Sequence, residues 1–350
     1  MPVRPAIANL PDYVAGARPP VGRRAYKLSS NESPFPPLPG VLAAVADAAA
    51  DINRYPDMIA AGLVEALAAH HGVESAQVVA GNGSVAVLGH VLTAFTGQGD
   101  EVVYPWRSFE AYPILAALSG ATGVGVPLGA EGRLDLPALL AAITPRTRVV
   151  MICSPNNPTG PAVRRDELKL FLDAVPSDVL VVLDEAYVEY VTDPDAATYA
   201  DVAPDHPNVI SLRTFSKAYG LAGLRVGYAI GRGRLIGAVR KAATPFGVNA
   251  AAELAATVSL SLDLAMRDRV AAVVAARDAM ADALRAQGWA VPDAQGNFVW
   301  LPAGADAVPF AQDATLAGVM VRAFDGSGVR VTTGEPEAVQ ALLEVAATWA

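Results

Sequence analysis

The stretch Ser211-Leu-Arg-Thr-Phe-Ser-Lys-Ala-Tyr-Gly-Leu-Ala-Gly-Leu-Arg-Val-Gly-Tyr228 decides how the rest of the chain is interpreted. An apolar start, typical of a buried strand, is followed by small hydroxyl side chains, Lys217, a glycine-rich connection and Arg225. A lysine beside packed strands can be shifted towards its neutral amine, which is able to form a Schiff base. Thr214, Ser216 and Arg225 supply donors that suit a phosphate. The stretch therefore indicates a site, although an isolated lysine after a strand is more often a surface residue.

The composition favours a folded protein of two domains. The chain has 350 residues, of which 53% are hydrophobic and 17% charged, so it can bury a large core. The net charge of -9 argues against a nucleic-acid partner. The single cysteine, Cys153, excludes an internal disulfide, and with the four histidines it makes no metal-site pattern. No stretch has the character of a signal peptide or a bilayer span, so we expect a cytoplasmic protein without a membrane partner.

Short β-rich segments alternate with helical periods over much of the chain. Seven strands are predicted at 77–80, 101–104, 123–126, 148–153, 179–183, 209–212 and 225–230. Helical periods lie between most of them, for example at 84–95 and 166–174. This alternation predicts an α/β fold with a seven-stranded, mostly parallel sheet covered by helices on both faces. In such sheets the functional residues gather at the carboxyl ends of the strands.

Three parts of the chain are expected to differ in structure. Residues 1–40 are rich in proline, which excludes helix from much of them and predicts an N-terminal arm that joins the small domain. Residues 41–245 hold the alternating segments and form the predicted large domain. Residues 246–350 form the predicted small α+β domain. This last part begins with a long helical tract at 250–287, and strand or helix patterns follow at 297–301, 329–332 and 336–349.

Four further motifs would meet the lysine at the ends of these strands. Gly81-Asn-Gly-Ser84 lies between a strand and a helix, where free backbone N–H groups and the helix dipole suit a phosphate. Ser154-Pro-Asn-Asn-Pro-Thr-Gly160 forms a rigid turn after a buried strand. Val182-Leu-Asp-Glu-Ala-Tyr187 places Asp184 at the end of an apolar strand, where a carboxylate needs a cationic partner. The fourth motif is Arg54-Tyr55-Pro56. Each motif can be structural alone, but together they favour a site.

With Leu28-x-x-Asn-Glu-x-Pro34, these motifs resemble those of fold-type I pyridoxal-phosphate aminotransferases, in particular the histidinol-phosphate branch. The resemblance covers nearly the whole chain. It implies that the cofactor is pyridoxal 5'-phosphate, held by Lys217 as an internal aldimine, and that the freed Lys217 acts as the general base. It also implies that Asp184 pairs with the pyridinium nitrogen. Asn157 and Tyr187 would reach the phenolic oxygen, and the catalytic residues would be Lys217, Asp184 and Tyr187.

The resemblance assigns further residues to the cofactor and the substrate. The phosphate would be bound by residues of the glycine turn and the lysine stretch, namely Gly83, Ser84, Thr214, Ser216 and Arg225. Phe109 would stack on the cofactor ring, with Tyr112 as the second candidate. Tyr55 would reach the cofactor phosphate of the neighbouring subunit, which implies a homodimer. The residues that would face the substrate are Tyr13, Asn31, Arg322 and Arg330, of which Arg330 best matches the arginine that holds the anionic group.

Two segments depart from the histidinol-phosphate pattern. Val85-Ala86 follows the glycine turn, where those enzymes usually continue with Asp-Glu. Tyr104-Pro-Trp-Arg-Ser-Phe-Glu-Ala-Tyr-Pro113 stands where those enzymes usually carry a short Pro-Thr-aromatic segment. Its part from Trp106 to Tyr112, with Ser30-Asn-Glu-Ser-Pro-Phe-Pro-Pro37, resembles the actinobacterial aromatic (phenylalanine) aminotransferases. We therefore expect transamination of phenylalanine, tyrosine and tryptophan with 2-oxoglutarate in ping-pong half-reactions, with histidinol-phosphate transamination as the alternative. Trp106 and Phe35 are candidate contacts for an aromatic side chain, although core packing is the commoner fate of such residues.

Three other classes of protein share parts of this pattern. A threonine-phosphate decarboxylase shares much of the template, and formation of a keto acid from an amino acid would exclude it. A regulator that borrows the domain would need an added DNA-binding segment, which the acidic balance opposes. A nicotinamide-dependent dehydrogenase needs Gly-x-Gly-x-x-Gly after its first strand, whereas Gly81-Asn-Gly-Ser-Val-Ala-Val87 lacks the third glycine.

Overall fold

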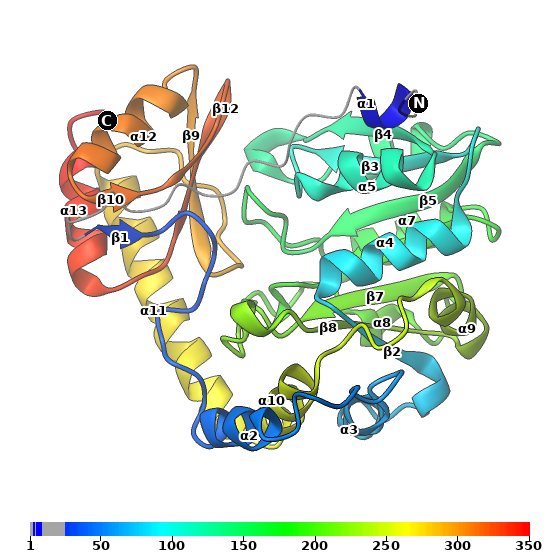
Figure 1. Cartoon of the computed structure of the whole chain (residues 1–350). Helices are drawn as coiled ribbons and strands as arrows, with labels where there is room; N and C mark the ends of the chain where they lie inside the picture. The colour runs from blue at the N-terminus through cyan, green and yellow to red at the C-terminus, as the bar shows by residue number, and fades with distance from the viewer. Residues whose placement is uncertain (1–2, 4, 9–24) are drawn as a thin grey trace.

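A seven-stranded sheet forms the centre of the chain in the computed structural model, which describes residue 3, residues 5–8 and residues 25–350 (Figure 1). Its strands in spatial order are β2 (Val78–Gly81), β8 (Gly227–Gly231), β7 (Val209–Thr214), β6 (Leu180–Asp184), β5 (Thr147–Cys153), β3 (Glu101–Trp106) and β4 (Thr122–Pro127). The pairings are parallel except those of β8, which runs antiparallel to β2 and β7. The predicted α/β fold with seven strands and a mostly parallel sheet is confirmed.

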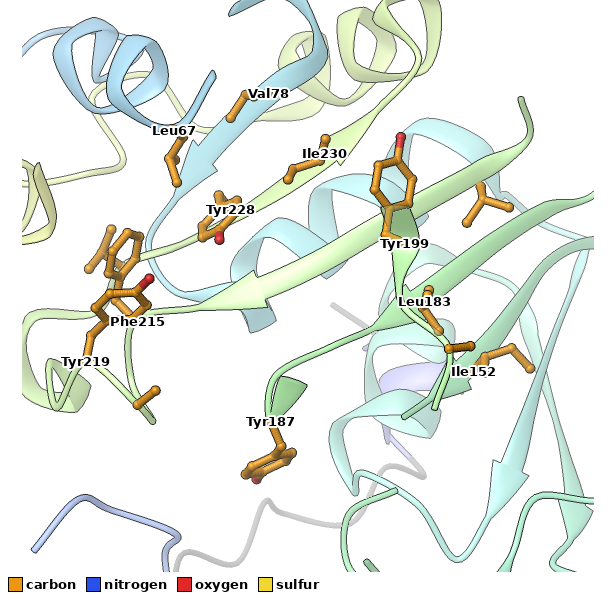
Figure 2. Packing of buried hydrophobic residues seen from close by; sticks show 14 of the residues in the cluster. Leu67, Val78, Ile152, Leu183, Tyr187, Tyr199, Phe215, Tyr219, Tyr228 and Ile230 are labelled. Carbon is orange, nitrogen blue, oxygen red and sulfur yellow. The ribbon is translucent and has the colours of Figure 1, made fainter. Parts of the chain in front are cut away.

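Helices cover both faces of this sheet because alternate residues of each strand face opposite sides. In β5, Val150 and Ile152 belong to one buried cluster together with residues of α3 (Ala61–His71), α7 (Arg165–Ala174) and α10 (Ala250–Leu260), and Figure 2 shows part of this cluster. Val149 and Met151 belong to a second cluster with residues of α4, α5 and α9. The helices before and between the strands are α2 (Val41–Ala49), α3 (Ala61–His71), α4 (Ser84–Phe95), α5 (Ala111–Ser119), α6 (Leu136–Ala141), α7 (Arg165–Ala174), α8 (Tyr199–Val202) and α9 (Gly233–Ala242).

The C-terminal segment builds a smaller unit beside the large sheet, coloured orange to red in Figure 1. Its three-stranded antiparallel sheet has the order β11 (Arg322–Phe324), β12 (Ser327–Thr332) and β9 (Phe298–Gly304). Residues of α11 (Asp263–Ala286), α12 (Ala307–Leu316) and α13 (Pro336–Ala346) share the core of this unit, whereas α10 packs against α2 and α3 of the large unit. The tract predicted at 250–287 is helical but interrupted, because Leu262 leaves the helical region with φ -108° and ψ 36°. The pattern did not predict α12 and β11.

The segment that follows residue 25 is tied to this smaller unit. Strand β1 (Tyr26–Lys27) pairs in parallel with β10 (Val319–Met320), and the backbone N–H of Thr332 donates to the carbonyl of Leu28. Helix α1 (Pro5–Ala8) is the one other element before β1 in the described residues. The division of the chain at residues 40 and 245 stays a prediction.

The sheet brings the motif residues to one edge. Cys153 at the end of β5 is the register partner of Asp184 at the end of β6, and Thr214 ends the neighbouring β7. Glycine is required at position 227 of β8, because a Cβ there would collide with the backbone nitrogen of Ser84. This close approach sets the first turn of α4 beside the strand ends.

Neither a membrane-spanning helix nor a cluster of metal ligands occurs in the described part of the chain. Within it, no helix combines the length and the apolar character that a membrane crossing requires. The same residues contain no group of three or more His, Cys, Asp or Glu side chains placed to hold a metal ion.

Candidate active site

A cavity of about 490 Å³ opens at the carboxyl ends of the strands and collects most of the predicted site residues. Both the large sheet and the smaller unit contribute to it, since Arg322 comes from β11 and Arg330 from β12. The predicted residues that line the cavity are Ser84, Phe109, Asn157, Asp184, Tyr187, Thr214, Ser216, Lys217, Arg225, Arg322 and Arg330.

Lys217 lies three residues beyond β7 and points its amine across the cavity. Its Nζ donates to the carbonyl oxygen of Ser30 at 3.1 Å and lies 5.8 Å from the centre of the Tyr187 ring. Burial disfavours the charged ammonium, and the nearby guanidinium groups of Arg330 and Arg225 add to this effect, so the pKa of Lys217 falls to about 7. Near neutral pH, a large fraction of the protein molecules therefore carries Lys217 as the neutral, nucleophilic amine.

Asp184 is a buried carboxyl group held by two neutral donors. The hydroxyl of Tyr112 donates to Oδ2 at 2.7 Å, and the backbone N–H of Ala186 donates to Oδ1 at 3.2 Å. Burial raises the pKa of Asp184 to about 6, and the Tyr112 bond opposes that rise. Tyr112 is fully buried, so the structure places Phe109 rather than Tyr112 on the cavity wall. No sequence signal links Tyr112 to a carboxylate 72 residues away.

Asn157 is oriented by Arg330. The Arg330 guanidinium donates to Oδ1 of Asn157 at 2.6 Å and to the carbonyl of Ser29 at 2.6 Å. Because arginine only donates, the bonded atom of Asn157 must be its oxygen, and the amide nitrogen is the end left for the cavity. The Arg330 guanidinium carbon also lies 5.8 Å from the ring centres of both Phe298 and Phe324. These two hydrogen bonds and two ring contacts hold the Arg330 guanidinium in place.

Asn31, predicted to face the substrate, lies behind Tyr187 and is not among the residues that line the cavity. Its side chain is 1% exposed; Nδ2 donates to the Tyr187 hydroxyl at 2.9 Å, and Oδ1 accepts from Thr332 Oγ1 at 2.9 Å. Since the Tyr187 oxygen already accepts a hydrogen bond from Asn31, its own hydrogen is available to a group in the cavity. Three distant segments therefore set the direction of this hydroxyl.

Hydrogen-bond donors that suit a phosphate gather at the start of α4. Gly83 precedes the helix with φ 85°, and a Cβ at that position would lie 2.6 Å from a guanidinium nitrogen of Arg225. Arg225 donates to Ser216 Oγ at 3.4 Å, and the Ser216 N–H donates to Thr214 Oγ1 at 3.0 Å. A helix N-terminus, two hydroxyls and a guanidinium thus surround one small space, an arrangement that suits a phosphate.

Four residues singled out from the sequence lie away from this cavity or outside the described residues. Tyr55 is 85% exposed, and its ring centre lies 5.1 Å from that of Phe246. Tyr13 lies outside the described residues. Trp106 packs against Tyr104, and Phe35 lies under Arg269; neither is among the described residues that line the cavity.

Comparison with known proteins gives the family. The sequence profile of aminotransferase class I and II matches residues 24–345. An aromatic amino acid aminotransferase of Streptomyces avermitilis is 52% identical over 344 residues, which cover 98% of this chain and 96% of that protein. One of Thermobifida fusca is 53% identical over 349 residues, covering 99% and 97%. The structure of histidinol-phosphate aminotransferase from Sinorhizobium meliloti in complex with pyridoxal-5'-phosphate matches with a TM-score of 0.88 at 29% identity, covering 99% of this chain and 98% of that chain. This chain belongs to the class I and II aminotransferases.

Proposed function

We propose that this aminotransferase transfers the amino group of phenylalanine, tyrosine or tryptophan to 2-oxoglutarate. The names of the relatives at 52% and 53% identity support the aromatic substrate, as does the segment 104–113. The observation that carries the chemistry is the cavity that joins Lys217, whose pKa is lowered to about 7, to the buried Asp184. The cytoplasmic location expected from the sequence stays a prediction.

The cavity fits pyridoxal phosphate, the cofactor of this family, in three respects. The absence of a side chain at Gly83 lets the Arg225 guanidinium approach the start of α4, where Arg225, Ser84, Thr214 and Ser216 together offer donors for a phosphate. The Asp184 carboxylate has neutral hydrogen-bond partners and suits a cationic ring nitrogen. Asn157 and Tyr187 have hydrogens available to the phenolic oxygen, and Phe109 supplies an aromatic face for the ring. When bound, this cofactor accepts the electrons released at the α-carbon of the substrate.

Lys217, Asp184 and Arg330 have different roles in the proposed reaction. The neutral amine of Lys217 would hold the cofactor, and the same amine, when free, would serve as the base that removes and returns the proton of the substrate α-carbon. The Asp184 carboxylate keeps a proton on the ring nitrogen. Arg330 binds the substrate carboxylate with its planar guanidinium, and its bond to Asn157 couples the substrate position to the group that contacts the phenolic oxygen.

The amino donor is tested by a single half-reaction. Phenylalanine or histidinol phosphate is mixed with the cofactor-loaded protein, and the change in cofactor absorbance is followed in a stopped-flow instrument. We expect phenylalanine to react at least about tenfold faster at equal concentration, a difference of about 1.4 kcal/mol. Aspartate serves as the control for an amino acid without a ring. Faster conversion by histidinol phosphate would instead assign the chain to that reaction.

We also propose a homodimer in which Tyr55 contacts the cofactor phosphate of the neighbouring subunit. Tyr55 lies on an apolar surface with Met58, Ile59 and Phe246, which are 56%, 50% and 43% exposed. Tyr55→Phe keeps the ring beside Phe246 and removes only the hydroxyl. We expect cofactor affinity to fall about tenfold, as for the loss of one hydrogen bond to a charged group, without dissociation of the dimer. Equilibrium dialysis and sedimentation measure the two quantities, and unchanged cofactor affinity would contradict the role of Tyr55.

A further inference from the structure

Glu110 and Arg322 form an ion pair on the wall of the cavity. Arg322 Nη2 lies 2.8 Å from Glu110 Oε2, and the two side chains are 13% and 31% exposed. Both residues line the cavity. Glu110 belongs to the segment 104–113, which departs from the histidinol-phosphate pattern, and the roles described above leave it without a function.

Arg322 is the immediate neighbour of Arg330. The two residues are cross-strand partners in the antiparallel pair β11–β12, so their side chains leave the same face of the sheet. Their guanidinium carbons lie 5.6 Å and 5.8 Å from the centre of the same ring, that of Phe324. A tetrahedral dianion next to Arg330 could therefore reach both arginines, whereas one planar guanidinium is enough for a carboxylate.

We propose that Glu110 is a specificity-determining residue, which holds Arg322 and thereby makes the cavity prefer a carboxylate over a phosphate beside Arg330. This inference rests on the proposed function, in which Arg330 binds the anionic group of the substrate. A phosphate monoester carries a charge of about -1.5 to -2 at neutral pH, so the Glu110 carboxylate would repel it. Arg322 would also be less able to bind the phosphate, because it is already paired with Glu110. A carboxylate carries a single charge and needs Arg330 alone.

A purely structural role for Glu110 predicts a different result. Two arginines directly opposite each other on one face repel, and an acid beside them offsets that repulsion. In that case the loss of the Glu110 charge lowers the stability of the protein but leaves the choice between anionic groups unchanged. Binding selectivity therefore separates the two roles.

The experiment compares two unreactive ligands that share a ring and a spacer, 3-phenylpropanoate and 2-phenylethylphosphonate. Each is titrated into the cofactor-loaded protein, and the dissociation constant is taken from the change in cofactor absorbance. In Glu110→Gln we expect the phosphonate to bind about tenfold more tightly than in the wild type, with the carboxylate changed by no more than about twofold. Glu110→Asp keeps the charge and should retain the wild-type preference.

Two further variants make the result specific to this pair. In an Arg322→Gln background the added Glu110→Gln change should no longer favour the phosphonate, as in a double-mutant cycle. Asp325→Asn removes the same charge from an exposed position one residue after β11 and should change neither dissociation constant by more than about twofold. Equal tightening of both ligands in Glu110→Gln, or no tightening, overturns the proposal. Because neither ligand reacts, this outcome is separate from failure of the phenylalanine half-reaction, which counts against the proposed function.

Discussion

Replacing Lys217 with alanine is expected to slow transamination by about 10⁴-fold or more, because in the proposed mechanism one side chain both holds the cofactor and moves the α-proton. Among the described residues, no lysine other than Lys217 lines the cavity. The half-reaction with phenylalanine, followed by cofactor absorbance, measures the loss. Conversion at more than a few per cent of the wild-type rate would contradict the assignment of Lys217.

The fold should survive this substitution. A lysine whose pKa is lowered from 10.5 to about 7 binds its proton less tightly in the folded chain than in the unfolded one. The cofactor-free wild type should therefore gain stability as the pH rises from about 7 towards 10.5, and Lys217→Ala should lack this gain. Thermal unfolding at several pH values measures the difference. Lys27→Ala, which removes a nearby but exposed amine, should change the rate by no more than about threefold.

Replacing Asp184 with asparagine is expected to slow the half-reaction by about 10³-fold, comparable to the loss of a key electrostatic partner in other active sites. An amide has nearly the shape of the carboxylate but cannot keep a proton on the ring nitrogen. The wild-type and variant proteins should bind the cofactor phosphate through the same donors at Gly83 and Arg225. A variant that retains more than about one-tenth of the wild-type rate would exclude this role for Asp184.

The same variant should be at least as stable as the wild type when no cofactor is bound. The pKa of Asp184 is raised from its ordinary value of 3.8 to about 6, so the folded chain holds this proton more tightly than the unfolded chain does. Its contribution to stability is present below about pH 3.8 and is lost as the pH rises through about 6. The advantage of Asp184→Asn should therefore appear above pH 6 and shrink in acid, as thermal unfolding would show.

Tyr112→Phe provides a milder version of this test. It removes the 2.7 Å bond that favours the carboxylate, so the pKa of Asp184 should rise further. The rate should then fall mainly on the acid side of the pH profile. Tyr104→Phe is the matched control. Tyr104 is also a buried tyrosine, with its ring centre 6.2 Å from that of Tyr112, but the hydroxyl that donates to Asp184 is that of Tyr112. An acid limb that moves equally in both variants would rule out the specific role of Tyr112.

Local patterns were enough to predict the sheet and the position of the site. Alternation of strand and helix periods predicted all seven strands, and α4 begins and ends at the predicted residues 84 and 95. The motifs around Asn157, Asp184 and Lys217 each follow a strand. The carboxyl ends of neighbouring parallel strands therefore bring them together, independently of the conformation of the connecting loops. The small C-terminal sheet was predicted less completely, because β11 is only three residues long.

Contacts between distant segments could not be predicted in this way. The Tyr112 bond to Asp184 spans 72 residues, the Arg322 bond to Glu110 spans 212, and the Thr332 bond to Asn31 spans 301. The local sequence shows which residue is present and whether it lies on a helix, a strand or a loop. Its hydrogen-bond partner depends on how distant helices and strands pack together. Asn31 illustrates this, since its bonds to Tyr187 and to Thr332 of β12 join segments far apart in the chain. The substrate contact that the family resemblance implies for Asn31 stays a prediction.

The sequence by itself determined the fold and the order of the motifs along the strands, because these depend on short-range periodicity and on residue types at strand ends. The cofactor roles of those motifs were implied by the family resemblance. The tertiary structure alone decided which groups modify the proposed catalytic residues. Burial at the strand ends shifts the pKa of Lys217 and of Asp184, and packing of the smaller unit against the sheet sets Arg322 against Glu110. Desolvation and ion pairing act through space, and so they exist only once the chain has folded.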